Sequence, residues 1–300
     1  MKIKLKKRYL VLALLIVLFG VSHMEFLTFR KSEEKQRKYL LKRGQADVSF
    51  GSFDVQGQEV HYTHVGDDTL PLVVMVHGAP GSSSGMLNYL ANKALTGVAQ
   101  VVAVDRTGYG HSGFGKAELS LEKQAAAIRP IVEKYRASQP ASNNTHSPVA
   151  ILAGHSFGGP VIARLAMDFP ELVDGLVIVA GSIDPSLEPR DWWQVPLDWP
   201  VVRWLLPPAA RVCNQEILPL PGELEKMLPL WEKITCPVTV IQGTKDKLVH
   251  PGNAAFARKM LVNSSRVEID TLQNQGHFIL WTKKDRVAEK IIEMITRLKG

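Results

Sequence analysis

The chain has 300 residues, of which 45% are hydrophobic and 22% are charged, values close to those of a soluble globular protein. This composition excludes wholesale disorder, a collagen-like fibre and a polytopic membrane protein, and a total of two cysteines excludes a scaffold built from disulfides. The net charge of +7 is the unusual value, because a basic chain often binds nucleic acid or an anionic membrane surface.

The positive charge is concentrated near the N-terminus. Residues 2–8 carry five basic side chains and no acidic ones, and residues 25–44 carry seven basic and three acidic side chains. These two segments contribute nine positive charges, which leaves −2 for residues 45–300. Most of the chain is therefore slightly acidic, and a nucleic-acid partner is not expected.

An uncharged apolar run at residues 9–21 lies between the two basic segments. A basic stretch followed by an apolar stretch of 13 residues is typical of a secretory signal, and it is short for a spanning helix, which needs about 20 residues. Gly20-Val21-Ser22 offers a cleavage site, whereas an uncleaved helix would extend to Leu27. Residues 1–29 are therefore predicted to be a signal peptide or a membrane anchor, and we favour the anchor. Both alternatives export the rest of the chain to the periplasmic or extracellular side.

Residues 30–46 are polar and favour a helix, and we interpret them as a linker between the N-terminal segment and a single domain at 47–300. Cys213 and Cys236 would be able to pair in an oxidising compartment. Because Cys236 begins a predicted buried strand, where free cysteines are common, the sequence leaves both the disulfide and the free thiols open.

Strand and helix patterns alternate along the domain. A hairpin is predicted at 48–54 and 58–64, and apolar strands are predicted at 72–76, 101–104, 149–152, 176–179, 238–241 and 267–269. Helical periodicity occurs at 86–95, 121–135, 161–167, 254–261 and 285–298. Short apolar strands separated by helices predict an α/β fold with a mostly parallel sheet of about eight strands and helices on both faces.

One insertion interrupts this alternation. Residues 182–235 show no clear strand pattern, are rich in proline and contain five of the six tryptophans. We expect this segment to form a small helical cap.

Gly154-His155-Ser156-Phe157-Gly158 matches the pattern G-x-S-x-G. It follows a predicted strand and precedes a predicted helix, and the flanking glycines permit a tight, strained turn that exposes the serine hydroxyl. The helix N-terminus behind this turn supplies positive potential. The segment therefore has the features of a nucleophile that attacks carbonyl carbon.

Several motifs in a fixed order then make residues 48–298 resemble the α/β-hydrolase family. His77-Gly78-Ala79-Pro80-Gly81 is similar to the family's H-G-x-P-G oxyanion loop, and residues 105–112 are similar to its D-R-x-G-x-G-x-S loop. Gly243-Thr244-Lys245-Asp246 and Gly276-His277-Phe278 resemble the late loops that carry the acid and the base of the family.

The resemblance implies a catalytic triad of Ser156, Asp246 and His277. His277 would take the serine proton and return it to the leaving group, while Asp246 would orient the imidazole. The backbone N–H groups of Phe157 and, by resemblance, Ala79 would form the oxyanion hole. No metal and no other cofactor is expected, because the sequence contains neither H-E-x-x-H nor C-x-x-C.

Other residues compete for these roles. His250 is a local rival for the base, and Asp174 or Asp270 are rivals for the acid. Two glycine-rich patterns between residues 108 and 116 lack the helix or the hydroxyl that nucleotide binding needs. Epoxide hydrolases and haloalkane dehalogenases resemble this arrangement but use aspartate as nucleophile, and this chain has serine.

The predicted substrate is a small-molecule ester of an apolar acyl group, which makes the chain a carboxylesterase or lipase-like enzyme. A serine nucleophile equally leaves a thioester, an amide, a lactone or an activated C–C bond open. His77 and the tryptophans of the cap are candidates for the pocket, although the tryptophans would equally pack the cap onto the sheet or face lipid: Trp192, Trp193, Trp199 and Trp204. An aminopeptidase similar to proline iminopeptidases is an alternative that would bind the substrate amine through acidic cap residues: Glu188, Asp191, Asp198 or Glu216. A catalytically inactive binding module is a further alternative. The oligomeric state is not predicted.

Overall fold

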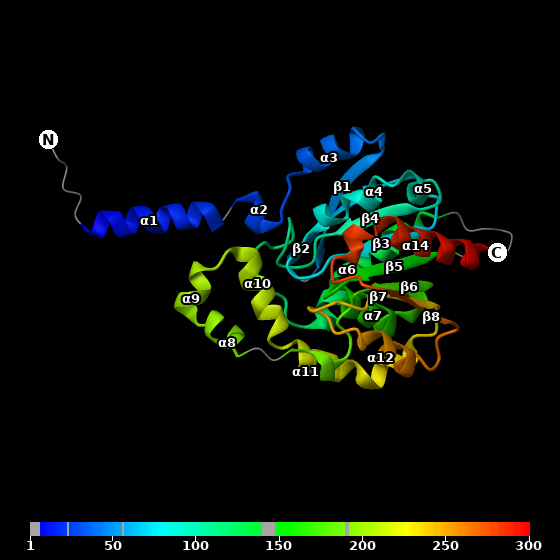
Figure 1. Cartoon of the computed structure of the whole chain (residues 1–300). Helices are drawn as coiled ribbons and strands as arrows, with labels where there is room; N and C mark the ends of the chain where they lie inside the picture. The colour runs from blue at the N-terminus through cyan, green and yellow to red at the C-terminus, as the bar shows by residue number, and fades with distance from the viewer. Residues whose placement is uncertain (1–6, 23, 56, 140–147, 190–191) are drawn as a thin grey trace.

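A single eight-stranded sheet forms the centre of the computed structural model, which describes residues 7–22, 24–55, 57–139, 148–189 and 192–300 (Figure 1). The spatial order is β1-β2-β4-β3-β5-β6-β7-β8, in which β2 runs antiparallel to both of its neighbours and the other adjacent pairs are parallel. The mostly parallel sheet predicted from the sequence is confirmed. Its strands are β1 (Val48–Val55), β2 (Gln58–Val65), β3 (Leu72–Val76), β4 (Gln100–Val104), β5 (Ala150–His155), β6 (Gly175–Val179), β7 (Val238–Gly243) and β8 (Val267–Leu272).

Helices cover both faces of this sheet (Figure 1). Alternate side chains of a strand point to opposite faces, so Val74 and Val76 of β3 pack in one core cluster and Val73 and Met75 pack in the other. Burial on both faces explains why the central strands are apolar throughout. The first cluster contains residues of α6 (Leu121–Ala137), α7 (Gly158–Asp168) and α12 (Asn253–Met260), and the second contains residues of α4 (Leu87–Leu90), α5 (Lys93–Thr96) and α14 (Lys284–Lys299).

The single helix predicted at 86–95 is wrong, because the chain forms two short helices, α4 and α5, in its place. The side chain of Asn92 accepts hydrogen bonds from the backbone N–H groups of Ala94 and Leu95. These hydrogen bonds make Asn92 the N-cap of α5, which begins at Lys93.

The insertion between β6 and β7 is helical. It consists of η3 (Pro185–Leu187), α8 (Gln194–Leu197), α9 (Pro200–Leu205), α10 (Pro208–Ile217), α11 (Leu220–Met227) and η4 (Leu228–Lys233). Cys213 of α10 and Cys236 before β7 are both free thiols, and burial raises the pKa of each to about 12.

The N-terminal segment forms α1 (Lys7–Ser22), α2 (Glu25–Thr28) and α3 (Glu33–Leu41), and α1 projects away from the sheet (Figure 1). Within the described ranges, no helix has both the length and the apolar character that crossing a membrane requires. The segment 30–46 differs from the linker predicted for it, because α3 packs against the domain and Leu40 is fully buried in the second core cluster.

Candidate active site

Ser156 occupies a strained turn between β5 and α7. Its φ angle is 54°, in the left-handed region, and its backbone N–H donates to the carbonyl of Val179 at 3.0 Å. A Cβ atom on Gly154 would lie only 2.3 Å from the carbonyl oxygen of Gly158. Gly154 is therefore required because β5 and α7 approach each other closely at this turn, and Gly158 is required because a Cβ atom there would lie 2.4 Å from the carbonyl oxygen of Val76 in β3.

The structure brings Asp246 and His277 together from the loops that follow β7 and β8. Nδ1 of His277 lies 2.9 Å from Oδ2 of Asp246, while Oδ1 of Asp246 accepts from the backbone N–H groups of Leu248 and Val249. Burial alone would raise the pKa of Asp246, but the hydrogen bond from His277 and then that from Val249 outweigh it and hold this pKa below its usual value. Because Nδ1 donates to a carboxylate, Nε2 is the ring nitrogen left to accept a proton.

Ser156 and His277 line one pocket with a volume of about 900 Å³. Asp246 does not line this pocket and lies behind His277, to which it is hydrogen-bonded. The pocket is also lined by apolar side chains, as expected for a site that holds an apolar group: Ala79, Pro80, Leu87, Leu248, Phe278 and Trp281.

Two backbone N–H groups of this region, those of Phe157 and Ala79, have no acceptor in the part of the chain that the structure describes. Phe157 follows Ser156 directly, and Ala79 lines the same pocket. Among the described residues, neither N–H donates a hydrogen bond to another group of the chain. A Cβ atom on Gly78 would lie 2.8 Å from Cβ of Ser156, so the loop that carries Ala79 passes very close to the serine.

His77 and His155 line the pocket but are held neutral. Burial, followed by the charge of Arg106, lowers the pKa of His77 to about 3, and burial, followed by the charge of His277, lowers the pKa of His155 to about 3. Nε2 of His77 accepts the backbone N–H of Arg106 at 3.0 Å, and Nδ1 donates to the carbonyl of Gly78. His77 is therefore committed to the loop structure rather than free for a substrate.

The rival acids and the rival base have other partners. Asp174 pairs with Arg136, and Asp270 pairs with Arg286. Nδ1 of His250 accepts the backbone N–H of Gly252.

The interpretation of the cap tryptophans as pocket residues is wrong. Trp192, Trp193, Trp199 and Trp204 are exposed, Trp192 by 81% and Trp204 by 61%, and none of them lines the pocket that contains Ser156. Trp204 lies in α9, and the other three lie in the turns that precede α8 and α9. All four are exposed, so they do not pack the cap onto the sheet either.

The acidic cap residues do not support a site for a substrate amine. Glu188 hydrogen-bonds Ser182, Asp198 lies near Arg203, and Glu216 pairs with buried Arg106. None of these three carboxylates lines the pocket, and Asp191 lies outside the described residues.

Four of the pocket residues that sequence reasoning missed precede the domain in the chain: Glu25, Phe29, Lys31 and Tyr39. Aromatic side chains in an otherwise polar stretch were the only available signal, and nothing local to that stretch indicates what they contact.

Comparisons with known proteins agree with this architecture. A probable 1-acylglycerol-3-phosphate O-acyltransferase of Oryza sativa subsp. japonica is 33% identical over 129 residues, which cover 42% of this chain and 29% of that protein. The chain thus spans less than a third of that relative. The solved structure of a bacterial membrane phospholipase A superposes with a TM-score of 0.64 at 19% identity, covering 98% of this chain and 100% of the other. A putative lipase from Acinetobacter baumannii gives a TM-score of 0.63 at 19% identity, with 89% and 95% of the two chains covered.

At these identities the solved structures show the fold alone. The family model described as the alpha/beta hydrolase family matches residues 73–290, which include the serine turn, both late loops and the oxyanion loop. This chain therefore belongs to the alpha/beta hydrolase family.

Proposed function

We propose that this hydrolase is a serine carboxylesterase or lipase-like enzyme that cleaves esters of apolar acyl groups through an acyl-enzyme. The observation that carries the proposal is that Ser156 and His277 face one apolar pocket, while Asp246 holds His277 in the tautomer that leaves Nε2 free. Several similar proteins have names that refer to acyl esters, among them lipases and a phospholipase, which supports the same chemistry.

In the proposed acylation step, Oγ of Ser156 attacks the ester carbonyl while Nε2 of His277 takes its proton. The oxyanion accepts hydrogen bonds from the N–H groups of Phe157 and Ala79, each worth about 3 kcal/mol in the transition state. His277 then protonates the alkoxide, and the alcohol leaves as the acyl-enzyme forms. In deacylation His277 removes a proton from water, which attacks the acyl group, and Ser156 regains its proton as the acid departs.

A fluorophosphonate probe tests the nucleophile directly. Native protein is expected to be labelled, and Ser156→Ala is not, whereas Ser186→Ala, on the exposed η3 turn, remains labelled. Native protein is expected to hydrolyse p-nitrophenyl esters and to lose this activity once the probe has labelled it. A protein that is not labelled and hydrolyses no ester would instead favour a binding module.

We also propose that the N-terminal segment exports the catalytic domain and tethers it to the membrane. The support is the sequence pattern, in which basic residues 2–8 precede the apolar run at residues 9–21, and this run lies within α1. Expression of the full chain followed by fractionation and by external protease treatment tests this. Recovery of the enzyme in the cytosolic fraction, protected from protease, would contradict it.

A further inference from the structure

One wall of the pocket comes from the segment that precedes the domain. Glu25, Phe29, Lys31 and Tyr39 line the same pocket as Ser156. We call residues 25–41, which comprise α2, the following turn and α3, the N-terminal strap. The strap is more than one hundred residues away from Ser156 in the sequence, so its position depends entirely on tertiary contacts.

The first of these contacts fixes Phe29. Its φ angle is 54°, a left-handed conformation that costs energy for a residue other than glycine. Its carbonyl oxygen accepts hydrogen bonds from Oγ of Ser82 at 2.5 Å and Oγ of Ser84 at 3.1 Å, and both serines also line the pocket. The turn at Phe29 is therefore held by the segment that directly follows the oxyanion loop.

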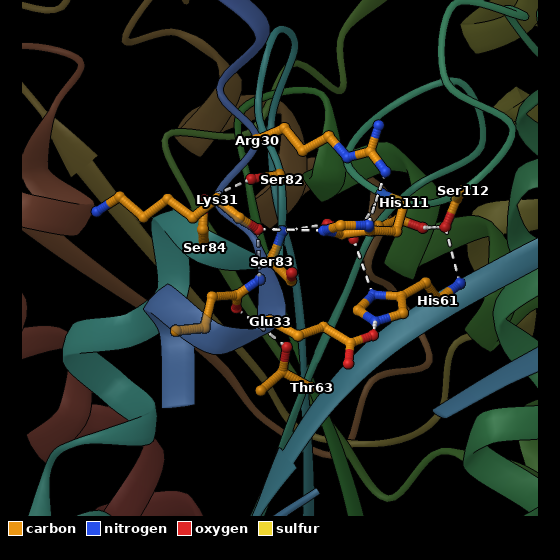
Figure 2. A network of polar contacts seen from close by, with 12 residues as sticks. Arg30, Lys31, Glu33, His61, Thr63, Ser82, Ser83, Ser84, His111 and Ser112 are labelled. Atoms are coloured by element: carbon orange, nitrogen blue, oxygen red, sulfur yellow. Dashed lines mark hydrogen bonds and ion pairs between the residues drawn. The ribbon is translucent and has the colours of Figure 1, made fainter. Parts of the chain in front are cut away.

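The second contact involves His111 of the loop after β4, whose ring lies between Arg30 and Lys31 (Figure 2). A guanidinium nitrogen of Arg30 donates to Nδ1 of His111 at 2.8 Å, and Nε2 of His111 donates to the carbonyl of Lys31 at 3.1 Å. Because Arg30 has only donors, these partners assign the neutral tautomer with hydrogen on Nε2. Each nitrogen of this ring therefore holds the strap.

The third contact joins the strap to a fully buried carboxylate. Nε2 of His61 lies 3.0 Å from Glu33 at the start of α3 (Figure 2). Nδ1 of the same ring lies 3.0 Å from Asp105. Asp105 also accepts from the backbone N–H groups of Ser83 and His111. The same carboxylate thus organises the strap and the loop beside the oxyanion loop.

The end of the strap is packed as firmly as its start. The hydroxyl of Tyr39 donates to Asn88 at 2.8 Å, and Gln36 is buried and accepts from Thr63. Leu40 lies in the second core cluster. These contacts are those of a fixed wall rather than of a flexible tether.

We propose that the N-terminal strap is a fixed wall of the substrate pocket and that Phe29 and Tyr39 select the acyl chain through apolar contact. The inference rests on the function proposed above. An acetyl group is too small to reach across a pocket of about 900 Å³, whereas a medium-length chain has enough length to contact the strap. Phe29 is the better probe, since it is 47% exposed in the free enzyme and has surface available to bury.

The experiment compares Phe29→Ala with Trp204→Ala, which removes an exposed aromatic ring of the cap outside the pocket. The ratio of kcat/KM for p-nitrophenyl decanoate to that for the acetate is expected to fall about tenfold in Phe29→Ala and to stay unchanged in Trp204→Ala. Phe29→Leu, which keeps an apolar side chain, is expected to recover most of the ratio. Thermal unfolding checks that the variants are folded.

Calorimetric titration with decanoate provides a readout that needs no catalysis. Binding to wild-type protein is expected to weaken about tenfold in Phe29→Ala and not in Trp204→Ala. Equal affinities in all three proteins, or no binding of decanoate to the wild type, would overturn the inference. Failure of the proposed function has a different signature, because decanoate binding would still depend on Phe29 while esters stay intact and Ser156 stays unlabelled.

Discussion

Arg106 and Glu216 form a fully buried ion pair that joins the loop after β4 to the cap helix α10. The guanidinium also donates to the carbonyls of His77 and Gly78 in the oxyanion loop, and the carboxylate also accepts from Tyr109. A single pair of charges therefore holds both the cap and the loop that passes beside the nucleophile.

Glu216→Ala is expected to destabilise the fold by about 3–5 kcal/mol, because it leaves the Arg106 charge buried without its partner. Urea unfolding measures this change. The matched control is Glu133→Ala, which breaks a pair with Arg129 in which both side chains are exposed and which is expected to cost less than about 1 kcal/mol. Equal effects of the two substitutions would show that the buried pair does not hold the cap.

Asp246→Asn is expected to lower kcat for ester hydrolysis about 10⁴-fold while the protein stays folded. An amide in this place offers Nδ1 of His277 either an NH₂ donor or a neutral acceptor, so the tautomer with Nε2 as base is no longer favoured. Asp270→Asn is the control, since that carboxylate pairs with Arg286, and its kcat is expected to stay within about threefold of the wild type. Comparable losses in the two variants would remove Asp246 from its proposed role.

The sheet and the loops around Ser156 could be predicted because their signals are local. A strand buried on both faces is apolar at every position, as in β3 and β5, and the loops that follow such strands must meet at one edge of a parallel sheet. Gly154 also has a local cause, the close approach of β5 and α7.

The strap and the cap surface could not be predicted because their positions depend on partners far away in the chain. Phe29 and Glu33 are held by polar groups of Ser82, Ser84 and His61, and such pairs leave no periodic pattern. The composition of the cap leaves its tryptophans open to the pocket, to the packing of the cap or to a surface that faces lipid. Their exposure depends on how the cap segments lie on the domain, which composition does not encode.

His155 is expected to make the fold sensitive to acid. Its pKa is about 3 in the folded state against 6.5 for an ordinary histidine, so between these values the unfolded chain binds a proton that the folded chain does not. Stability is therefore lost as pH falls below about 6.5. His155→Gln is expected to reduce the slope of unfolding free energy against pH by about 1.4 kcal/mol per pH unit between pH 4.5 and 6. Urea unfolding in that range measures both slopes, and identical slopes would show that His155 is protonated in the folded protein.

His61 is expected to have the opposite dependence on pH. Burial would lower its pKa, but the hydrogen bonds and charges of Asp105 and then Glu33 outweigh burial and raise it above 6.5. The other groups that face it are the ring of His111, with centroids 4.8 Å apart, and the ring of Phe50. A raised pKa means that its stabilising effect is complete below about pH 6.5 and is lost as pH rises through the folded value.

Glu33→Gln should therefore destabilise the protein more at pH 6 than at pH 9, by about 1 kcal/mol at the lower pH, because the charged imidazolium loses one of its two carboxylate partners. The effect is limited because the Glu33 side chain is half exposed and solvent screens the pair. Glu34→Gln on the same helix is the control and is expected to have little effect at either pH, since among the described residues its side chain has no hydrogen bond or ion pair. Urea unfolding of the wild type and both variants at the two pH values gives the comparison. A Glu33→Gln effect that is equal at pH 6 and pH 9 would mean that His61 holds the strap as a neutral ring, and the charge of Glu33 would then contribute nothing to fixing that wall of the pocket.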